Sequence, residues 1–258
     1  MTEPGLAGVA LAAGRGERLR PLTDLLPKPL CPMGNRPMVD LALERLEPFV
    51  GAGPARLAVN THYLSALVAA HLTGRVWLSE EQPTVLGTAG ALGALRPWID
   101  GRAVLLTNSD AYLPSGLAGL VEGWDGARIR LLCKDIGRPA DFGSLRYVGA
   151  CLMPWGFVEP LPATPGGLYE LSWRAELERG SVELLTTDDV AIDCGRPSDY
   201  LAANLHASGG RSVVGEGAVV AGEIERCVVW PNAYVGPDEH LVDTVRAGTR
   251  DAPVTVPA

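Results

Sequence analysis

The sequence lacks the residue patterns typical of disulfide-rich, zinc-binding and membrane-spanning proteins. Its five cysteines are odd in number and widely spaced, and no C-x-x-C pair occurs, which argues against a disulfide framework and a zinc site. The four histidines show no metal-ligand spacing. No stretch approaches the roughly 18 apolar residues of a membrane span. We therefore expect the cysteines to be core residues in a reducing compartment.

An excess of basic charge is also missing. The 258 residues include 22 Lys and Arg against 30 Asp and Glu, for a net charge of −8. This balance argues against nucleic acid or an anionic membrane surface as the main partner. The apolar run 6–12 is too short for a signal peptide, lacks a basic leader and runs into a glycine loop. We expect a soluble cytoplasmic protein with one large α/β domain and an appendage.

The most informative segment of the chain is residues 11–30. A loop of small residues, 12–16, follows the first apolar run, and the cations Arg18, Arg20 and Lys28 come soon after. Small residues let backbone N–H groups approach an anion closely, and nearby cations neutralise a polyphosphate. This pattern predicts a triphosphate-binding turn after the first strand. The candidate nucleotide-binding residues here are Leu11, Ala12, Ala13, Gly14 and Gly16.

Neither of two common phosphate loops fits this segment. The dinucleotide motif needs a third glycine where Leu19 stands, and the Walker motif needs a Gly-Lys-Ser/Thr that does not occur here. The segment resembles the signature of the sugar-1-phosphate nucleotidyltransferases (nucleoside-diphosphate-sugar pyrophosphorylases), L-A-A-G-x-G-x-R-L-x-P-L-T followed by P-K-P-L. Every defined position of that signature is matched within residues 11–30.

The rest of the chain up to about residue 208 alternates strand-like and helix-like runs. This alternation predicts an α/β fold, and the resemblance implies a Rossmann-like mixed sheet flanked by helices over a catalytic domain of residues 1–208. The expected strands are 6–12, 57–60, 75–78, 103–107, 129–133, 147–153 and 190–193. The expected helices are 37–49, 63–72, 88–95, 167–179 and 197–207.

After Gly209 and Gly210 the pattern changes. Val214 and Val220 are six residues apart, and Val229, Val235 and Leu241 repeat the same spacing with small or turn residues between them. A hexapeptide period is typical of a parallel β-helix. We expect residues 209–258 to form a short left-handed parallel β-helix of about two coils, which packs on the catalytic domain or joins copies of the chain as a homo-oligomer. An irregular β tail is the alternative.

Two aspartates are candidates for a metal site. Asp110 follows the buried apolar strand 103–107, and Asp193 follows a second strand-like run. Carboxylates at strand ends are suitable ligands for Mg²⁺, which prefers oxygen. The segment ending at Asp110 resembles the family motif Asn-Gly-Asp, with Ser109 in place of glycine, and the segment from Asp193 resembles Asp-x-Gly-x-Pro-x-Asp-Tyr. The resemblance implies that both aspartates bind Mg²⁺ and that Asn108 contacts substrate.

Residues 80–92 resemble the base-recognition segment of the family, E-x-x-P-L-G-T-A-G-A-L. A carboxylate from Glu80 or Glu81 could accept two hydrogen bonds from guanine, whereas the amide of Gln82 is better suited to uracil or thymine. Gly87 would let the base lie against the backbone, and Thr88 would start a helix. The Leu-Gly-Thr-Ala-Gly form resembles mannose-1-phosphate guanylyltransferase-like members, so GTP is favoured over the pyrimidine nucleotides.

The family reaction is attack by a sugar-1-phosphate on the α-phosphorus of a nucleoside triphosphate, which releases pyrophosphate. The resemblance implies that Arg18 and Lys28 are catalytic and that Gly149 lies against the sugar. A Glu-Lys-Pro segment that normally precedes this glycine is missing, and Arg146 is a candidate to replace its charge. Two alternatives therefore stay open. One is a cytidylyltransferase acting on phosphocholine, a polyol phosphate or a phosphonate, and the other is a non-catalytic nucleotide-sugar-binding regulator.

Overall fold

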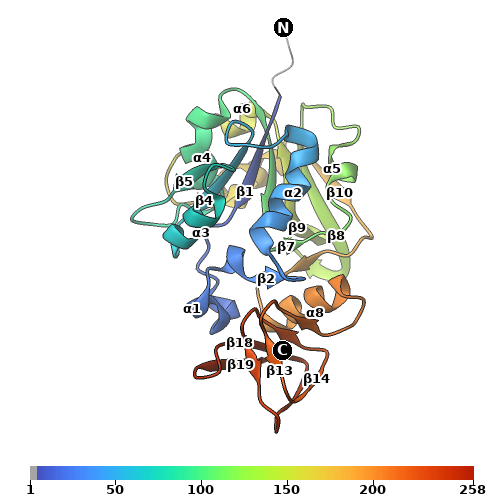
Figure 1. The fold of residues 1–258 in the computed structure, drawn as a ribbon. Coiled ribbons are helices and arrows are strands. Elements are labelled where there is room, and N and C mark those ends of the chain that lie inside the picture. The colour runs from blue at the N-terminus through green and yellow to red at the C-terminus, as the bar shows by residue number, and fades with distance from the viewer. Residues whose placement is uncertain (1–4) are drawn as a thin grey trace. The chain divides into compact units, whose positions relative to one another are not determined.

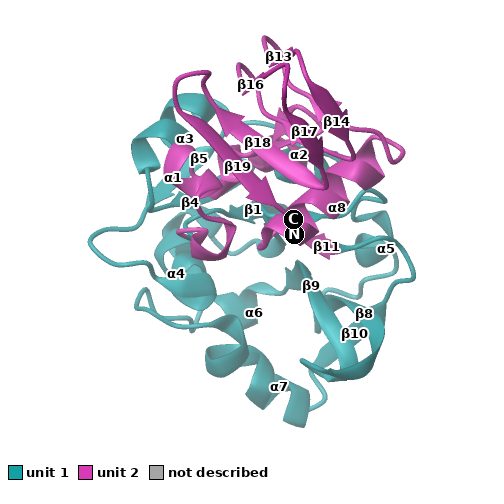
Figure 2. Ribbon diagram, turned by 90° about the horizontal axis from the view of Figure 1, so that it is seen from below, with its two compact units in different colours: residues 1–14, 42–191 teal, residues 15–41, 192–258 magenta. Residues whose placement is uncertain are grey.

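The computed structural model describes residues 5–258, and the chain divides into two compact units (Figure 2). Unit 1 comprises residues 1–14 and 42–191, and unit 2 comprises residues 15–41 and 192–258. This division differs from the expected one, 1–208 and 209–258, because residues 15–41 and 192–208 group with the C-terminal strands. Residues 1–4 of the expected first domain lie outside the described residues.

Unit 1 is built on a seven-stranded sheet of order β10-β8-β9-β6-β1-β4-β5 (Figure 1). β1 pairs in parallel with β4 and β6, whereas β9 runs antiparallel to both β6 and β8. The expected α/β class with a mixed sheet is confirmed. The strands of unit 1 are β1 (Leu6–Leu11), β4 (Leu57–Thr61), β5 (Trp77–Glu80), β6 (Ala103–Asn108), β7 (Ala111–Tyr112), β8 (Ile129–Ala140), β9 (Gly143–Met153) and β10 (Val182–Thr186).

The helices of unit 1 connect these strands, and α2 begins at the end of the first segment of unit 2. Residues 167–179, expected as one helix, form a π-helix followed by a short α-helix. No helix among residues 5–258 is long and apolar enough to cross a membrane. The helices are α2 (Met38–Val50), α3 (Ser65–Leu72), α4 (Gly87–Ile99), α5 (Ala118–Val121), α6 (Trp155–Val158), the π-helix Tyr169–Trp173 and α7 (Arg174–Glu178).

The core of unit 1 lies along the central strands. Val9 of β1 and Leu106 of β6 are fully or almost fully buried, and Leu92 and Leu95 of α4 pack in the same cluster. Continuous apolar runs are typical of interior parallel strands, because both faces of such strands are covered. All five cysteines of the chain are buried and carry free thiols, as expected for core residues. Burial raises the pKa of Cys31, Cys133 and Cys151 to about 12 in each case.

Unit 2 joins the segment after the first strand to the C-terminal part of the chain. The buried hydroxyl of Tyr200 donates to the carbonyl of Pro32, and the backbone N–H of Gly34 donates to Asn204 Oδ1 over 2.9 Å. Its elements before residue 209 are the 3-10 turns Glu17–Leu19 and Lys28–Leu30, α1 (Leu22–Leu25), β2 (Pro32–Met33), β3 (Arg36–Pro37), β11 (Ile192–Asp193) and α8 (Pro197–Ala207).

The C-terminal strands pair in parallel at regular intervals. Val214 pairs with Val229, and Val220 pairs with Val235, so each partner lies 15 residues further along the chain. The strands belong to separate small sheets, and the last two pair antiparallel, so the expected left-handed parallel β-helix is not confirmed. They are β12 (Val213–Val214), β13 (Val219–Val220), β14 (Glu223–Glu225), β15 (Val228–Val229), β16 (Tyr234–Val235), β17 (His240–Val242), β18 (Thr244–Gly248) and β19 (Pro253–Pro257).

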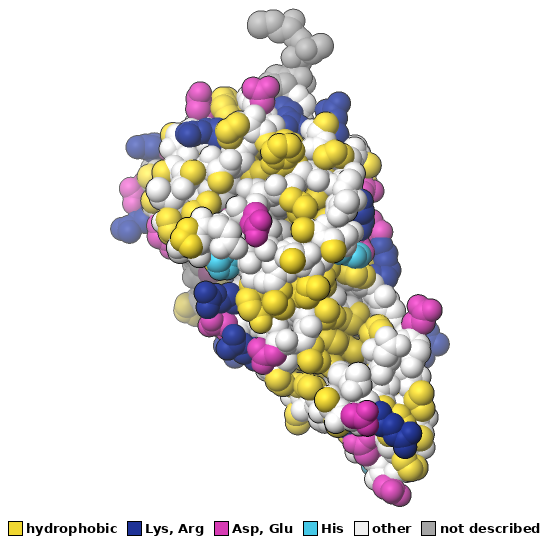
Figure 3. Space-filling view, turned by 60° about the vertical axis from the view of Figure 1, so that its left-hand side comes forward, with side chains coloured by type: hydrophobic (Ala, Val, Ile, Leu, Met, Phe, Trp, Pro, Cys, Tyr) yellow, Lys and Arg dark blue, Asp and Glu magenta, His cyan; other side chains and the backbone are white. Residues whose placement is uncertain are grey.

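The surface carries both signs of charge. Figure 3 shows Lys and Arg side chains interspersed with Asp and Glu on one face, with hydrophobic side chains between them. This mixed pattern agrees with the modest negative net charge of −8.

Candidate functional site

The polar residues at the ends of the central parallel strands form a buried network in unit 1. The backbone N–H of Ala12, just after β1, donates to Asn60 Oδ1 over 2.7 Å. Asn60, near the end of β4, donates through Nδ2 to Glu81 Oε1 over 2.7 Å, and the backbone N–H of Leu86 donates to Glu81 Oε2 over the same distance. This network ties the loop after β1 to the loop before α4. The ring Nδ1 of His62 lies 2.8 Å from the Glu81 carbonyl oxygen, which accords with a structural role for His62.

The loop after β1 presents a run of backbone donors. Within residues 5–258, no hydrogen bond uses the backbone N–H groups of Ala13, Gly14, Arg15 or Gly16. Consecutive backbone N–H groups of this kind can cradle an anion. Of the predicted nucleotide-binding residues, Leu11 is the last residue of β1, and the Ala12 N–H is already engaged by Asn60. The four following residues are therefore the better candidates for phosphate contacts.

The two glycines of this loop differ in what surrounds them. A Cβ added to Gly14 would meet no atom within 4 Å, so packing does not require glycine there. Gly16 has a φ of +65°, and a Cβ there would lie 2.8 Å from Thr23 and 3.1 Å from Lys28. Gly16 is thus explained by the turn itself. Gly14 leaves open space next to the free backbone donors.

Unit 2 contains a cluster of charged side chains. Arg18 Nη2 lies 3.4 Å from Asp193 Oδ2, and Lys28 Nζ lies 3.9 Å from Asp193 Oδ1. Arg18 and Asp193 are exposed, whereas Lys28 is buried. An exposed ion pair contributes at most about 1 kcal/mol, so a phosphate could displace it at little cost. Gly195 allows this arrangement, because a Cβ there would lie 2.6 Å from the Arg18 guanidinium.

A cavity of about 430 Å³ adjoins this cluster within unit 2. Arg18 and Arg196 line it together with the first turn of α8 and residues 257–258. Two guanidinium groups and a helix N-terminus are compatible with a phosphate or pyrophosphate.

A second group of predicted residues lies at the end of β6 in unit 1. Gly149 has a φ of +86° and lies at an irregularity of the β8–β9 pairing, where residues 148–150 of β9 stand opposite the single residue Leu132 of β8. A Cβ on Gly149 would come within 3.2 Å of Asn108 Nδ2 and 3.0 Å of Ala111. The fold therefore brings Asn108 and Gly149 together, and Asp110 lies two residues after the end of β6.

The metal ligands predicted from sequence fall in different units, Asp110 in unit 1 and Asp193 in unit 2. Among residues 5–258, no group of three or more His, Cys, Asp and Glu side chains is arranged to hold a metal ion by itself. Each carboxylate taken singly is compatible with Mg²⁺, because this ion is commonly held by one or two carboxylates together with substrate phosphates.

The two glutamates of the predicted base-recognition segment have different surroundings. Glu81 is only 2% exposed, and both of its carboxylate oxygens accept hydrogen bonds from Asn60 and Leu86. Glu80 is exposed, and its Oε1 accepts hydrogen bonds from Ser65 over 2.7 Å and from Gln82 over 3.4 Å. Glu80 is therefore the carboxylate that a base could reach without breaking the buried network.

The glycines of the same segment pack against backbone. A Cβ on Gly87 would lie 2.6 Å from the carbonyl oxygen of Gly166, and Cβ atoms on Gly90 and Gly93 would lie 2.3 Å from backbone oxygens of residues 164 and 162. The Thr88 hydroxyl accepts a hydrogen bond from the N–H of Leu168 over 2.8 Å. This face of α4 thus holds the segment 162–168, and that packing explains its glycines whether or not a base lies nearby.

Sequence reasoning missed two features of unit 1. Asn60 was not predicted as a site residue, although its position at the end of a parallel strand was a usable signal. A cavity of about 440 Å³ beside the β8–β9 hairpin was also missed, because its aromatic lining comes from residues far apart in the sequence.

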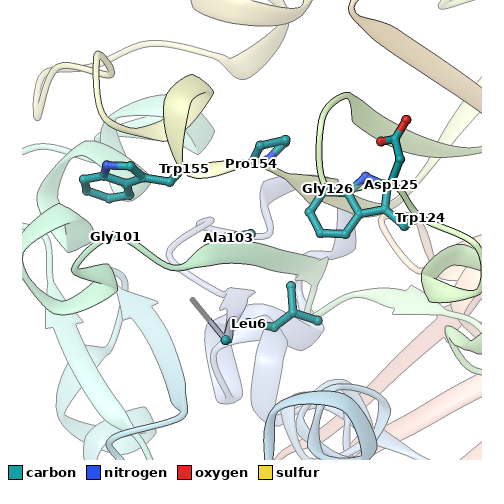
Figure 4. Close-up of a pocket in the computed structure, with 9 residues that line it drawn as sticks. Leu6, Gly101, Ala103, Trp124, Asp125, Gly126, Pro154 and Trp155 are labelled. Atoms are coloured by element: carbon teal, nitrogen blue, oxygen red, sulfur yellow. The ribbon is translucent and has the colours of Figure 1, made fainter. Parts of the chain in front are cut away.

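A third cavity, of about 550 Å³, lies where β1 and β6 begin, between Trp124 and Trp155 (Figure 4). It lies away from the strand ends that carry the predicted site.

Residues 7–140, just over half of the chain, match the family described as Nucleotidyl transferase. The chain is 28% identical over 270 residues to the low-salt glycan biosynthesis nucleotidyltransferase Agl11 of Haloferax volcanii, covering 85% of this chain and 72% of that protein. It is 27% identical over 295 residues to a probable mannose-1-phosphate guanylyltransferase 1 of Oryza sativa, covering 97% and 81%.

A solved structure shows the same fold. The crystal structure described as a mannose-1-phosphate geranyltransferase from Thermus thermophilus superposes with a TM-score of 0.72 at 21% identity. The superposition covers 98% of this chain and 95% of that one. At this identity the likeness establishes the fold alone.

Proposed function

Because the chain belongs to the nucleotidyl transferase family, and is therefore a nucleotidyltransferase, we propose that it transfers a nucleoside monophosphate from a nucleoside triphosphate to a sugar-1-phosphate. The observation that carries the proposal is the run of backbone N–H groups at residues 13–16 that have no partner within residues 5–258. These donors precede Arg18 and Lys28 in the sequence. Such a combination is suited to a polyphosphate.

The reaction needs alignment and charge neutralisation rather than a general base. The second pKa of a phosphate monoester is about 6, so the attacking oxygen is already ionised near neutral pH. That oxygen forms a bond to the α-phosphorus, and the bond between the α-phosphorus and the oxygen that links it to the β-phosphorus breaks, so that this oxygen leaves with pyrophosphate. Arg18 stabilises the departing pyrophosphate, and Lys28 stabilises the charge that gathers at the α-phosphate.

From the resemblance of the two sequence segments, we propose that Asp110 and Asp193 are Mg²⁺ ligands, each of which would bind the ion through a carboxylate oxygen. When bound, the ion neutralises charge on the reacting phosphates. The buried Lys28 orients the Asp193 carboxylate, which lies 3.9 Å from its Nζ, whereas the exposed Arg18 exchanges its contact with Asp193 for the phosphate. In unit 1, Asn108 and Gly149 contact the sugar, because the absence of a Cβ at Gly149 leaves room beside the Asn108 amide.

GTP is the proposed donor. Its support is the Leu-Gly-Thr-Ala-Gly sequence at residues 86–90, the exposed carboxylate of Glu80 and the name of the rice relative. A carboxylate can accept from both N1–H and the exocyclic amine of guanine. Glu81 holds the loop in place instead of contacting the base, because both of its oxygens are already engaged.

Two variants test the residue roles. Arg18→Ala and Asp110→Ala should each lower kcat on the order of a hundredfold or more, because each residue acts on charge that develops in the transition state. Pyrophosphate release under saturating substrates is the measurement. Arg75→Ala, which changes an exposed arginine in another part of the chain, is the control and should keep wild-type turnover. Wild-type turnover in both test variants would overturn the assignment.

The proposed function itself is tested by pyrophosphate release with Mg²⁺. GTP, CTP, UTP, dTTP and ATP are each run against a pooled panel of sugar-1-phosphates, phosphocholine and polyol phosphates. We expect release with GTP and a sugar-1-phosphate. Tight nucleotide-sugar binding by calorimetry without turnover on any pair would contradict the proposal and indicate a regulatory protein.

The C-terminal strands support a proposal about assembly. Their parallel pairing at intervals of 15 to 17 residues is compatible with two short β-helical coils. Val219 is 54% exposed there and could join copies of the chain. Sedimentation velocity should show an oligomer that Val219→Asp dissociates, and a monomeric wild type would contradict this.

We also place the protein in the cytoplasm, because its buried free thiols are suited to a reducing compartment.

A further inference from the structure

The cavity beside the β8–β9 hairpin has an unusual lining. Its volume is about 440 Å³, and its walls consist of four aromatic rings and two carboxylates. Among the described residues, no lysine or arginine lines it. The lining residues are Asp141, Phe142, Tyr147, Tyr169, Glu170 and Trp173.

The β8–β9 hairpin and the π-helix supply these side chains. Asp141 and Phe142 form the two-residue loop between β8 and β9, and the N–H of Tyr147 donates to Asp141 Oδ2 over 2.9 Å. The other three residues come from the π-helix, Tyr169–Trp173. A π-helix is rare and frequently occurs at functional sites, because its wider turn redirects side chains.

The aromatic rings form two pairs. The rings of Tyr147 and Trp173 are 5.0 Å apart with an interplanar angle of 66°, and those of Phe142 and Tyr169 are 6.1 Å apart at 50°. Tyr147 and Trp173 are the more buried pair, and burial holds the pKa of the Tyr147 hydroxyl well above its usual value. Tyr147 is therefore a neutral ring at physiological pH, and the negative charge of the cavity comes from Asp141 and Glu170.

Aromatic faces together with carboxylates favour a positively charged group that carries an apolar shell. We propose that this cavity binds an ammonium group carried by the acceptor phosphate. The inference rests on the proposed function, because it assigns the cavity to the end of the acceptor molecule that lies away from the phosphate group. Two sources of this chemistry are an amino sugar-1-phosphate and the phosphate ester of a quaternary amino alcohol.

The position of the cavity along β9 supports this assignment. Tyr147 precedes Gly149 by two residues, a separation of roughly 7 Å along a strand. Gly149 in turn lies beside Asn108, just before Asp110. An acceptor whose phosphate lies near Asp110 can therefore extend its other end toward the aromatic rings.

Calorimetry with matched pairs of ligands tests the proposal on the whole protein. The first pair is choline and its neutral isostere 3,3-dimethylbutan-1-ol, and the second is glucosamine and glucose at pH 7. We expect the cation of at least one pair to bind roughly tenfold more tightly than its neutral partner. The pair that shows this difference identifies the source of the ammonium group. Equal binding within both pairs would overturn the proposal.

Variants connect that binding to the cavity. Tyr169→Leu and Glu170→Gln change exposed lining residues and should each weaken the cation roughly tenfold. Trp77→Leu and Glu178→Gln, an exposed aromatic and an exposed carboxylate outside the cavity, are the matched controls and should bind as wild type does. Unchanged affinity in both cavity variants would overturn the assignment.

The binding experiment separates this proposal from the proposed function. Pyrophosphate release with glucose-1-phosphate, without any preference for a cation, would contradict the cavity proposal and leave the transferase intact. Cation binding at the cavity without nucleotidyl transfer on any acceptor would support the cavity and contradict the proposed function. Transfer to glucosamine-1-phosphate in preference to glucose-1-phosphate would support both. Preferential transfer to phosphocholine would support the cavity proposal and contradict the sugar-1-phosphate acceptor of the proposed function.

Discussion

Gly14 and Gly16 stand two residues apart in one loop, but the structure gives them different roles. An alanine at Gly16 would need a positive φ and would crowd Thr23 at 2.8 Å, so Gly16→Ala should lose about 1–3 kcal/mol of stability. Gly14→Ala meets no neighbour and should change stability by less than about 0.5 kcal/mol. Its methyl group would instead occupy the space beside the free N–H groups and raise the KM for the nucleotide on the order of tenfold.

Thermal unfolding and steady-state kinetics on both variants check this expectation. Each variant serves as the control for the other, because the two substitutions are chemically identical. The interpretation fails if Gly14→Ala unfolds at a lower temperature than Gly16→Ala, or if Gly14→Ala keeps the wild-type KM.

Glu80 and Glu81 form a second matched pair. In Glu81→Gln, the new amide would face a donor, either Asn60 Nδ2 or the N–H of Leu86. Rotation of the Asn60 amide does not relieve the conflict, because its Oδ1 already accepts from Ala12. We expect a loss of about 1–3 kcal/mol of stability for Glu81→Gln. The exposed Glu80→Gln should unfold as wild type does but discriminate less well between GTP and UTP.

Denaturant unfolding and the ratio of kcat/KM for the two nucleotides are the measurements. The sequence alone could not rank the two glutamates, since they are adjacent and chemically the same. The distinction arises because Asn60, which is 21 residues away from Glu81, reaches its carboxylate. If Glu80→Gln leaves the nucleotide ratio unchanged, Glu80 does not contact the base.

Among the elements, α4 shows how packing constrains a motif. Gly90 faces the backbone of the segment 162–166, where an added Cβ would lie 2.3 Å from a carbonyl oxygen. Gly90→Ala should therefore destabilise unit 1 by about 1–3 kcal/mol, since backbone cannot easily move aside. Gly119→Ala in α5, where nothing lies within 4 Å, is the control and should be neutral or slightly stabilising. Equal unfolding midpoints for the two variants would contradict this account of α4.

The elements that were predictable from sequence are those with strong periodicity. The buried runs of β1 and β6 and the amphipathic helix α2 were expected at nearly their observed positions. The expected strand at 75–78 is observed at Trp77–Glu80, and β10 was missed altogether. The outer half of the β8–β9 hairpin was also missed. Its residues are mostly exposed or half-buried, so no alternating apolar pattern marks the strands.

At the scale of the whole molecule, the division of the chain could not be anticipated. Residues 15–41 follow the first strand directly, yet they belong to the same unit as residues 192–258. The hydrogen bond from the N–H of Gly34 to Asn204 spans 170 residues, and the one from Tyr200 to Pro32 spans 168. Such pairings depend on the folded chain and leave no local signal in the sequence.

The motifs in the sequence were more informative about chemistry than about architecture. They identified Arg18, Lys28 and Asp193 as site residues, and in unit 2 both cations lie within 4 Å of the Asp193 carboxylate. They gave no indication of the aromatic cavity, because its rings come from a hairpin loop and a π-helix that share no sequence motif.

The central claim is that the protein joins a nucleotide to an acceptor phosphate and releases pyrophosphate. Phosphorus NMR of a reaction containing GTP, Mg²⁺ and the acceptor identified by the substrate panel tests it most directly. The account predicts that pyrophosphate and a diphosphate-linked product appear in equal amounts as GTP disappears. Formation of orthophosphate and GDP, with the acceptor unchanged, would contradict it and show hydrolysis at the γ-phosphate instead of nucleotidyl transfer.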